Sequence, residues 1–159
     1  MSVLLMILSV VLVVSTLTGS TNNYYNEPTD IKDCAVTKKF AEITNASMTP
    51  IPLKHGERFR WQAVLKIKET IHWGIMHVTL THNFKDYTNI TFLDSNFNLC
   101  DYFDDLIKEQ CPLKPGTYQI YSGAVISSLF WPGQYYGKAT AYNEKGEQIL
   151  CQKRDFTIV

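Results

Sequence analysis

The sequence predicts an all-β domain, a two-sheet sandwich of about seven strands. Most segments beyond residue 30 alternate apolar and polar side chains with a period of two, which is typical of strands with one buried face. Turn-forming Pro, Gly and Asn residues separate these segments at short intervals. Only residues 100–109 carry a helical pattern, about two turns long. Together these features favour a sandwich over an α/β architecture.

The first clear strand covers residues 58–68, and its apolar face is expected to carry Phe59, Trp61, Ala63, Leu65 and Ile67. Further strands follow around Met76, Val78 and Leu80, around Ile90 and Phe92, and around Tyr118 and Ile120. The last two strands are predicted at residues 134–143 and 148–158. Residues 143–146 between them form a tight hairpin turn, in which Gly146 supplies a positive φ. Residues 48–56 contain two prolines and a glycine and are predicted to be a loop.

The first twenty residues contain no charged side chain and are almost wholly apolar from Val3 to Val14. This run is shorter than the roughly 20 residues that span a bilayer, so a cleaved signal peptide at residues 1–20 is favoured over an uncleaved anchor. Residues 21–30 are polar, contain Pro28 and have no period, which indicates a flexible lead-in. Residues 31–159 are then of the size of one domain.

Four cysteines behind a signal sequence indicate two disulfides, for which three pairings exist. We expect a local bridge, Cys100–Cys111, and one that joins the two ends of the domain, Cys34–Cys151. The cysteine and histidine spacings do not match a zinc site, and no cofactor is expected. Asn45 and Asn89 begin N-glycosylation sequons, which fit a secreted chain.

Fifteen basic and fifteen acidic residues balance, so the chain lacks the concentrated positive charge that nucleic acid requires. No motif for an enzyme nucleophile or a phosphate loop is present. His72, His77 and His82 recur every five residues, so His77 faces away from the other two in a strand. Asp101 at a helix start complements the helix dipole more simply than it would form a catalytic acid pair. The sequence therefore predicts that the protein is not an enzyme.

The apolar strand faces allow two interpretations. They can interdigitate as a filled core, which the pattern alone favours, or they can line a pocket between splayed sheets. Residues 127–133 place three large apolar side chains, Leu129, Phe130 and Trp131, in a loop before a Pro-Gly pair. Exposed apolar clusters mark binding or membrane contacts, although the same side chains can tuck under the sandwich edge. A basic strip on residues 58–68 is either an anion-attracting surface or a solvated strand face.

Several motifs together resemble the ML lipid-recognition superfamily, and most closely its phosphatidylglycerol/phosphatidylinositol transfer branch. The most specific motifs are Asn98-Leu99-Cys100-Asp101, Cys111-Pro112-Leu113 with Pro115-Gly116, and the Pro132-Gly133 pair before a late strand. The resemblance covers about residues 30–159 and implies an immunoglobulin-like sandwich with a hydrophobic cavity between its sheets. It also implies the two disulfides chosen above, and no catalytic residue.

The resemblance implies a secreted or endolysosomal carrier that binds a phospholipid and transfers it between membranes, as a monomer with transient membrane contact. A sterol carrier of the same fold and a protein that presents a lipid to a receptor are the alternatives. Leu129, Phe130 and Trp131 would form the membrane-touching mouth. The residues expected in the wall of the cavity are Phe59, Trp61, Leu65, Met76, Val78, Phe92, Tyr118 and Ile120.

Overall fold

The computed structural model describes residue 34 and residues 40–159. The predicted signal peptide and lead-in lie outside these residues. Residues 40–159 form seven strands and one helix, in the order β1 (Ala41–Thr49), β2 (Arg58–Ile67), β3 (Gly74–Phe84), β4 (Tyr87–Asn98), α2 (Leu99–Ile107), β5 (Gly116–Val125), β6 (Gly133–Asn143) and β7 (Gln148–Ile158).

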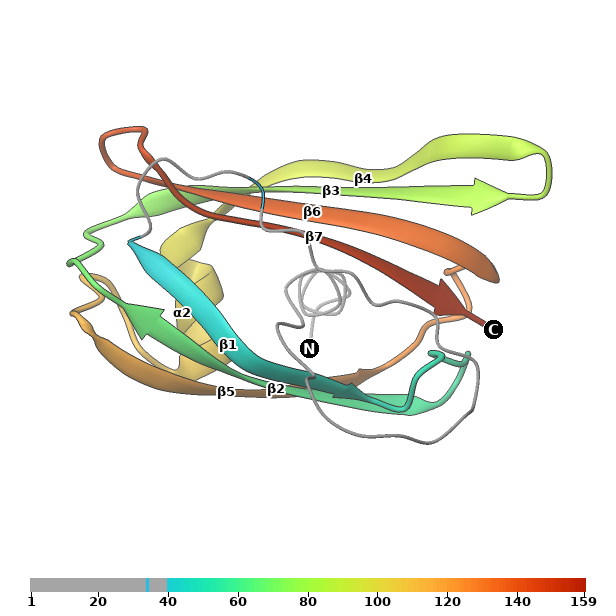
Figure 1. The fold of residues 1–159 in the computed structure, drawn as a ribbon, viewed down its shortest axis with the longest axis horizontal. Helices are drawn as coiled ribbons and strands as arrows, with labels where there is room; N and C mark the ends of the chain where they lie inside the picture. The colour runs from blue at the N-terminus through green and yellow to red at the C-terminus, as the bar shows by residue number, and fades with distance from the viewer. Residues whose placement is uncertain (1–33, 35–39) are drawn as a thin grey trace.

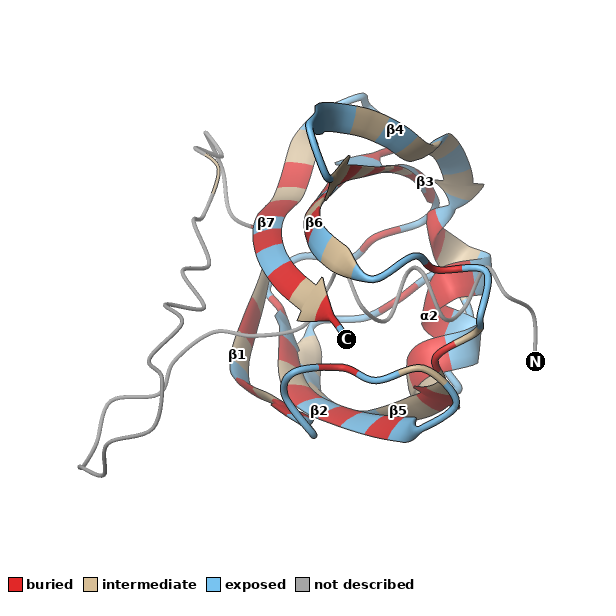
Figure 2. Cartoon of the chain, turned by 90° about the vertical axis from the view of Figure 1, so that its right-hand side faces the viewer, coloured by how far each residue is buried: buried red, intermediate tan, exposed pale blue. Residues whose placement is uncertain are grey.

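The strands form two antiparallel sheets that face each other, as Figure 1 shows. One sheet has the order β1-β2-β5, and the other has the order β4-β3-β6-β7. Helix α2 packs against β5, β3 and β4 and so closes one side of the sandwich. The edge strands β1 and β7 lie on the other side (Figure 2). The predicted immunoglobulin-like two-sheet sandwich is confirmed.

The core lies between the sheets because the inward side chains of each strand are apolar. The predicted inner faces of β2 and β3 are buried throughout, and Figure 2 shows the resulting stripes of buried and exposed residues. The hairpin between β6 and β7 also forms as expected, with Gly146 at φ 73°. The period-two pattern therefore identified the buried face of each of these strands correctly.

The sequence pattern missed one strand, β1. Its register against β2 shifts between Thr44 and Ser47, where Asn45 adopts φ 50°. This bulge places Ala46 on the buried face and interrupts the alternation that begins at Ala41 and Ile43. A bulge that breaks the period explains why the residues before the 48–56 loop did not read as a strand.

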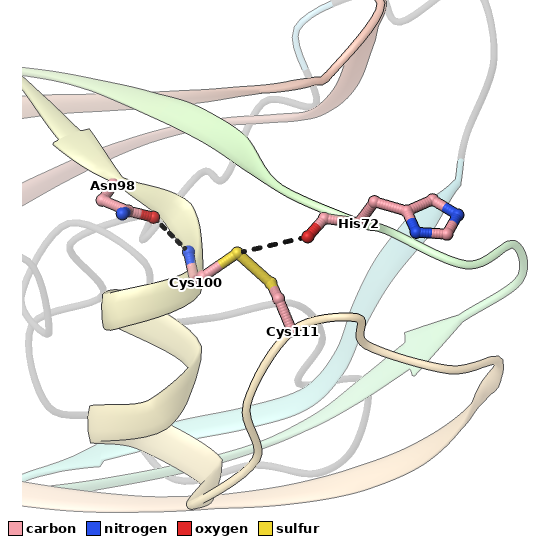
Figure 3. Close-up of a disulfide and its surroundings, with 4 residues drawn as sticks. All are labelled: His72, Asn98, Cys100 and Cys111. Atoms are coloured by element: carbon pink, nitrogen blue, oxygen red, sulfur yellow. Dashed lines mark hydrogen bonds between the residues drawn. A yellow bond between two sulfur atoms is a disulfide. The ribbon is translucent and has the colours of Figure 1, made fainter.

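Helix α2 is anchored at its start by a side-chain cap and a disulfide (Figure 3). The amide of Asn98 stands at the N-cap, and its Oδ1 accepts a hydrogen bond of 2.9 Å from the Cys100 N–H. Lys108 ends the helix in the left-handed region, and its N–H donates to the Asp104 carbonyl at 3.1 Å. The bridges Cys100–Cys111 and Cys34–Cys151 both form, as predicted.

No helix in the described part of the chain is long and apolar enough to cross a membrane.

Candidate functional site

A small apolar pocket lies between the two sheets, at the end where α2 packs. Its free volume is about 10 Å³, which is room for about one water molecule. Both sheets and the helix contribute to its lining: Ile43, Trp61, Leu65, Met76, Leu99, Tyr102, Phe103, Leu106, Ile120 and Leu150. Pockets that hold small organic ligands are roughly 300–1,000 Å³. A larger ligand at this position therefore requires the sheets to separate or the side chains to repack.

Four of the predicted wall residues line this pocket, namely Trp61, Leu65, Met76 and Ile120. Phe59 and Val78 are buried on the same inner faces but lie outside the pocket lining. Phe92 and Tyr118 are only partly buried and pack against the core from its margin. Every predicted wall residue thus belongs to the core or its margin, and half of them surround the cavity.

The helix supplies four lining residues that the strand analysis did not include. Leu99, Tyr102, Phe103 and Leu106 follow one another at the spacing i, i+3, i+4 and i+7. This spacing places side chains on one face of a helix. The helical pattern in the sequence therefore contained the signal for this part of the wall.

Two side chains that line the pocket carry buried polar atoms. The indole Nε1 of Trp61 and the hydroxyl of Tyr102 have no hydrogen-bond partner within the described residues. Burial raises the pKa of Tyr102 well above its ordinary value, so its hydroxyl remains a protonated donor. A buried donor that lacks an acceptor costs about 1–3 kcal/mol. A ligand oxygen that reached either group would recover part of this free energy.

A positive charge lies on the inner face of β7, the edge strand beside β1. Arg154 is only 1% exposed and stands directly across from Gly137 of β6. Along this face it lies between Leu150 of the pocket and Phe156, whose ring stacks on Tyr135. Burial lowers the pKa of Arg154 to about 10, so the guanidinium still carries its charge at neutral pH. The alternation of the strand placed Arg154 here, but the sequence analysis did not include it among the site residues.

The loop between β5 and β6 divides its three large apolar residues between surface and core. Leu129 is 67% exposed and Trp131 is 52% exposed. Phe130, by contrast, is buried, and its ring stacks on Phe92 at a centroid distance of 5.0 Å. The prediction that all three form an exposed mouth is therefore wrong for Phe130. A turn at residues 127–130 directs successive side chains to opposite sides, with the Phe130 N–H bonded to the Ser127 carbonyl.

Three side chains hold consecutive carbonyl groups of this loop. His55 Nε2 donates to the Phe130 carbonyl, and the Tyr135 hydroxyl donates to the Trp131 carbonyl at 2.8 Å. His82 Nε2 lies 3.3 Å from the Pro132 carbonyl, and its ring packs on Tyr135 at 4.3 Å. The backbone is thereby fixed while Leu129 and Trp131 remain outside.

The remaining histidines have structural environments. His77 faces outward, opposite to His82, and its Nε2 lies 2.7 Å from Asp94 Oδ1. Within residue 34 and residues 40–159, no three His, Cys, Asp or Glu side chains are placed to hold a metal ion. Asn45 and Asn89, which begin the two sequons, are both exposed and at positive φ.

A comparison with curated proteins finds a relative that is named a phosphatidylglycerol/phosphatidylinositol transfer protein, from Schizosaccharomyces pombe. It is 35% identical over 68 residues, which are 41% of this chain. The match spans only 35% of the length of that relative.

Among solved structures, the fold is similar to a Niemann-Pick type C2 protein from Japanese carpenter ant, with a TM-score of 0.55 and 12% identity over 82% of this chain and 99% of that one. It is also similar to chicken MD-1, solved in complex with lipid IVa, with a TM-score of 0.50 and 15% identity over 81% of this chain and 96% of that one. At these identities the likeness concerns the fold. The model of the ML domain family, however, matches residues 28–158. The chain therefore belongs to the ML domain family.

Proposed function

We propose that this protein is a carrier that binds a phospholipid between its two sheets and transfers it between membranes. The coarser statement follows from its family, because ML domain proteins are lipid-binding carriers without enzymatic activity. The phospholipid, of the phosphatidylglycerol or phosphatidylinositol type, is the finer part of the proposal. It is supported by the transfer protein of S. pombe, which matches part of the chain.

The observation that carries the proposal is the apolar pocket between the sheets. Its lining comes from both sheets and from α2, so a chain bound there would be removed from water on all sides. Moving an acyl chain from water into such surroundings is favourable by about 0.8 kcal/mol per CH₂ group. Because the pocket is small in this state, binding is expected to proceed with separation of the sheets. The protein would act by shielding the lipid and not by changing it.

The buried charge of Arg154 favours a phospholipid over a sterol. A guanidinium presents five donors and forms strong hydrogen bonds to phosphate. From the β7 edge it could hold a headgroup while the acyl chains extend toward Leu150 and the pocket. A sterol offers one hydroxyl and no charge, so it would leave this guanidinium unused. A sterol carrier remains the alternative function of the same fold.

A second alternative is a protein that presents a lipid to a receptor. The structure of chicken MD-1 with lipid IVa shows that a similar fold holds a lipid of a different kind. Such a protein would form a stable complex with its receptor and transfer little lipid between vesicles. A pull-down beside a transfer assay separates this function from carriage.

We further propose that the protein is secreted or resides in the endolysosomal lumen, where ML domain proteins are typically found. Its two disulfides fit such an oxidising compartment. We expect a monomer that contacts membranes transiently and has no nucleic-acid partner, in keeping with a formal net charge of zero.

Native mass spectrometry of the protein purified from its own cells, followed by lipid extraction, tests the proposed function. The expected result is one phospholipid per chain, with an anionic headgroup. A sterol in its place would support the alternative carrier. Recovery of no lipid, together with no transfer between vesicles, would contradict the carrier function.

The double substitution Leu129→Ser and Trp131→Ser is expected to slow vesicle-to-vesicle transfer roughly tenfold, because two exposed apolar side chains no longer enter the bilayer interface. Stability should not change, since neither side chain is buried. Fluorescent phospholipid transfer and thermal unfolding measure the two effects. The matched control replaces Trp73 and Ile75, which are 53% and 44% exposed at the opposite end of the sandwich. Equal slowing in both variants would contradict the role of this loop.

A further inference from the structure

The outer face of the β1-β2-β5 sheet contains an open hollow that the pocket between the sheets does not account for. Its volume is about 660 Å³, and all three strands contribute to it. Two arginines, Arg58 and Arg60, belong to its wall, together with polar residues such as Thr49 and Tyr121. This hollow is therefore polar and basic, in contrast to the apolar pocket inside.

The two arginines have no partner on the protein surface. Both are exposed, and neither forms an ion pair or side-chain hydrogen bond with a described residue. The nearby acids are already paired: Glu57 lies 3.8 Å from Lys54, and Glu42 lies 3.2 Å from Lys68. The positive charge in the hollow is thus available to an anion from outside the molecule.

The shape of the hollow follows from a glycine beside Arg60. Arg60 lies between Thr49 of β1 and Gly123 of β5 in the sheet register. A Cβ at Gly123 would lie 2.6 Å from the carbonyl oxygen of Phe59, so the backbone there admits only glycine. The missing side chain leaves room next to the Arg60 guanidinium. Tyr121, which is 70% exposed, stands at the rim with its ring in solvent.

The hollow lies at the same end of the sandwich as the apolar loop of residues 127–131. Arg58 pairs with Val125 at the end of β5, and the chain then continues into this loop. Two backbone hydrogen bonds hold the junction: Gly56 N–H to the Ile126 carbonyl at 3.0 Å, and Ile126 N–H to the Glu57 carbonyl at 3.1 Å. Free cations and the exposed side chains of Leu129 and Trp131 therefore border one another on a fixed frame.

We propose that this hollow is a docking site for anionic bilayers, in which Arg58 and Arg60 bind the phosphate of a lipid headgroup. Basic residues are attracted to anionic membrane surfaces, and aromatic rings such as that of Tyr121 favour the headgroup region. The headgroup site and the apolar loop together orient one end of the sandwich toward the membrane. The inference rests on the proposed function, because a carrier has to dock before it exchanges its lipid.

The test is vesicle co-sedimentation of the full chain with vesicles of phosphatidylcholine alone or of equal parts phosphatidylcholine and phosphatidylglycerol. The wild type is expected to prefer the anionic vesicles, and this preference should fall as salt is raised. The double substitution Arg58→Gln and Arg60→Gln is expected to weaken binding to anionic vesicles about 30-fold. Binding to the phosphatidylcholine vesicles should change little.

The matched control is Lys138→Gln with Lys153→Gln, an exposed cross-strand pair on the outer face of the other sheet. It removes the same net charge, so equal weakening in both variants would overturn the docking site and leave only a general charge effect. Unchanged binding of the arginine variant would also overturn it. Displacement of the protein from vesicles by low concentrations of glycerol phosphate would identify a site for a free anion and not for a bilayer.

Native mass spectrometry of the arginine variant separates this inference from the proposed function. A variant that retains its internal lipid but no longer binds anionic vesicles supports the docking site. If the wild type contains no lipid and yet binds anionic vesicles through the two arginines, the carrier function fails while the docking site stands.

Discussion

Replacing Cys34 and Cys151 with alanine is expected to lower the free energy of unfolding by about 5 kcal/mol. The bridge between them spans 117 residues, so it closes nearly the whole described domain into one loop. Such a loop reduces the entropy of the unfolded chain more than a short loop does. Urea unfolding of the wild type and the variant measures the difference.

The second disulfide supplies an internal control for this result. Cys100 and Cys111 are only 11 residues apart, and their removal should cost about 3 kcal/mol. Both variants leave no unpaired thiol. A larger loss from the short loop than from the long one would contradict the entropic explanation.

Replacing Arg154 with methionine is expected to reduce the affinity for anionic phospholipid by about 10- to 100-fold, while neutral lipid binds as before. Methionine keeps most of the side-chain length and removes the charge. A hydrogen bond between a buried guanidinium and a phosphate contributes about 1.5–3 kcal/mol, which corresponds to this range. Because its pKa of about 10 keeps Arg154 charged at neutral pH, the effect should be constant between pH 6 and 8.

Competition between phosphatidylglycerol and an uncharged lipid, read by native mass spectrometry, measures the effect of the Arg154 substitution. The exposed neighbour Lys153 is the matched control, since Lys153→Met removes one charge from the outer face of the same strand. An unchanged headgroup profile in Arg154→Met would contradict a role for Arg154 in headgroup binding. Thermal unfolding of both variants verifies that they fold.

Much of the fold was predictable because its signals are local. The alternation along β2 and β3 identified Phe59, Trp61 and Met76 as buried, since in a strand neighbouring side chains point to opposite faces. The bulge at Asn45 hid β1, because one extra residue reverses the alternation without a local signal that would announce it.

The candidate site was predictable only in part. Its strand residues followed from periodicity, whereas the helix residues Tyr102 and Leu106 face the pocket because α2 packs against the sheet edges. Phe130 was placed in the exposed mouth on composition alone. The tertiary contact with Phe92 makes its burial favourable, and no local pattern encodes that contact.

By itself, the sequence determined the sandwich, the two disulfides and the family to which the chain belongs. These properties depend on periodicity, on the cysteines and on motifs that are read along the chain. Only the tertiary structure decided the size of the pocket, the division of the 129–131 loop between core and surface, and the position of Arg58 and Arg60 beside it. These features depend on side chains that are distant in the sequence and that meet only when the two sheets pack.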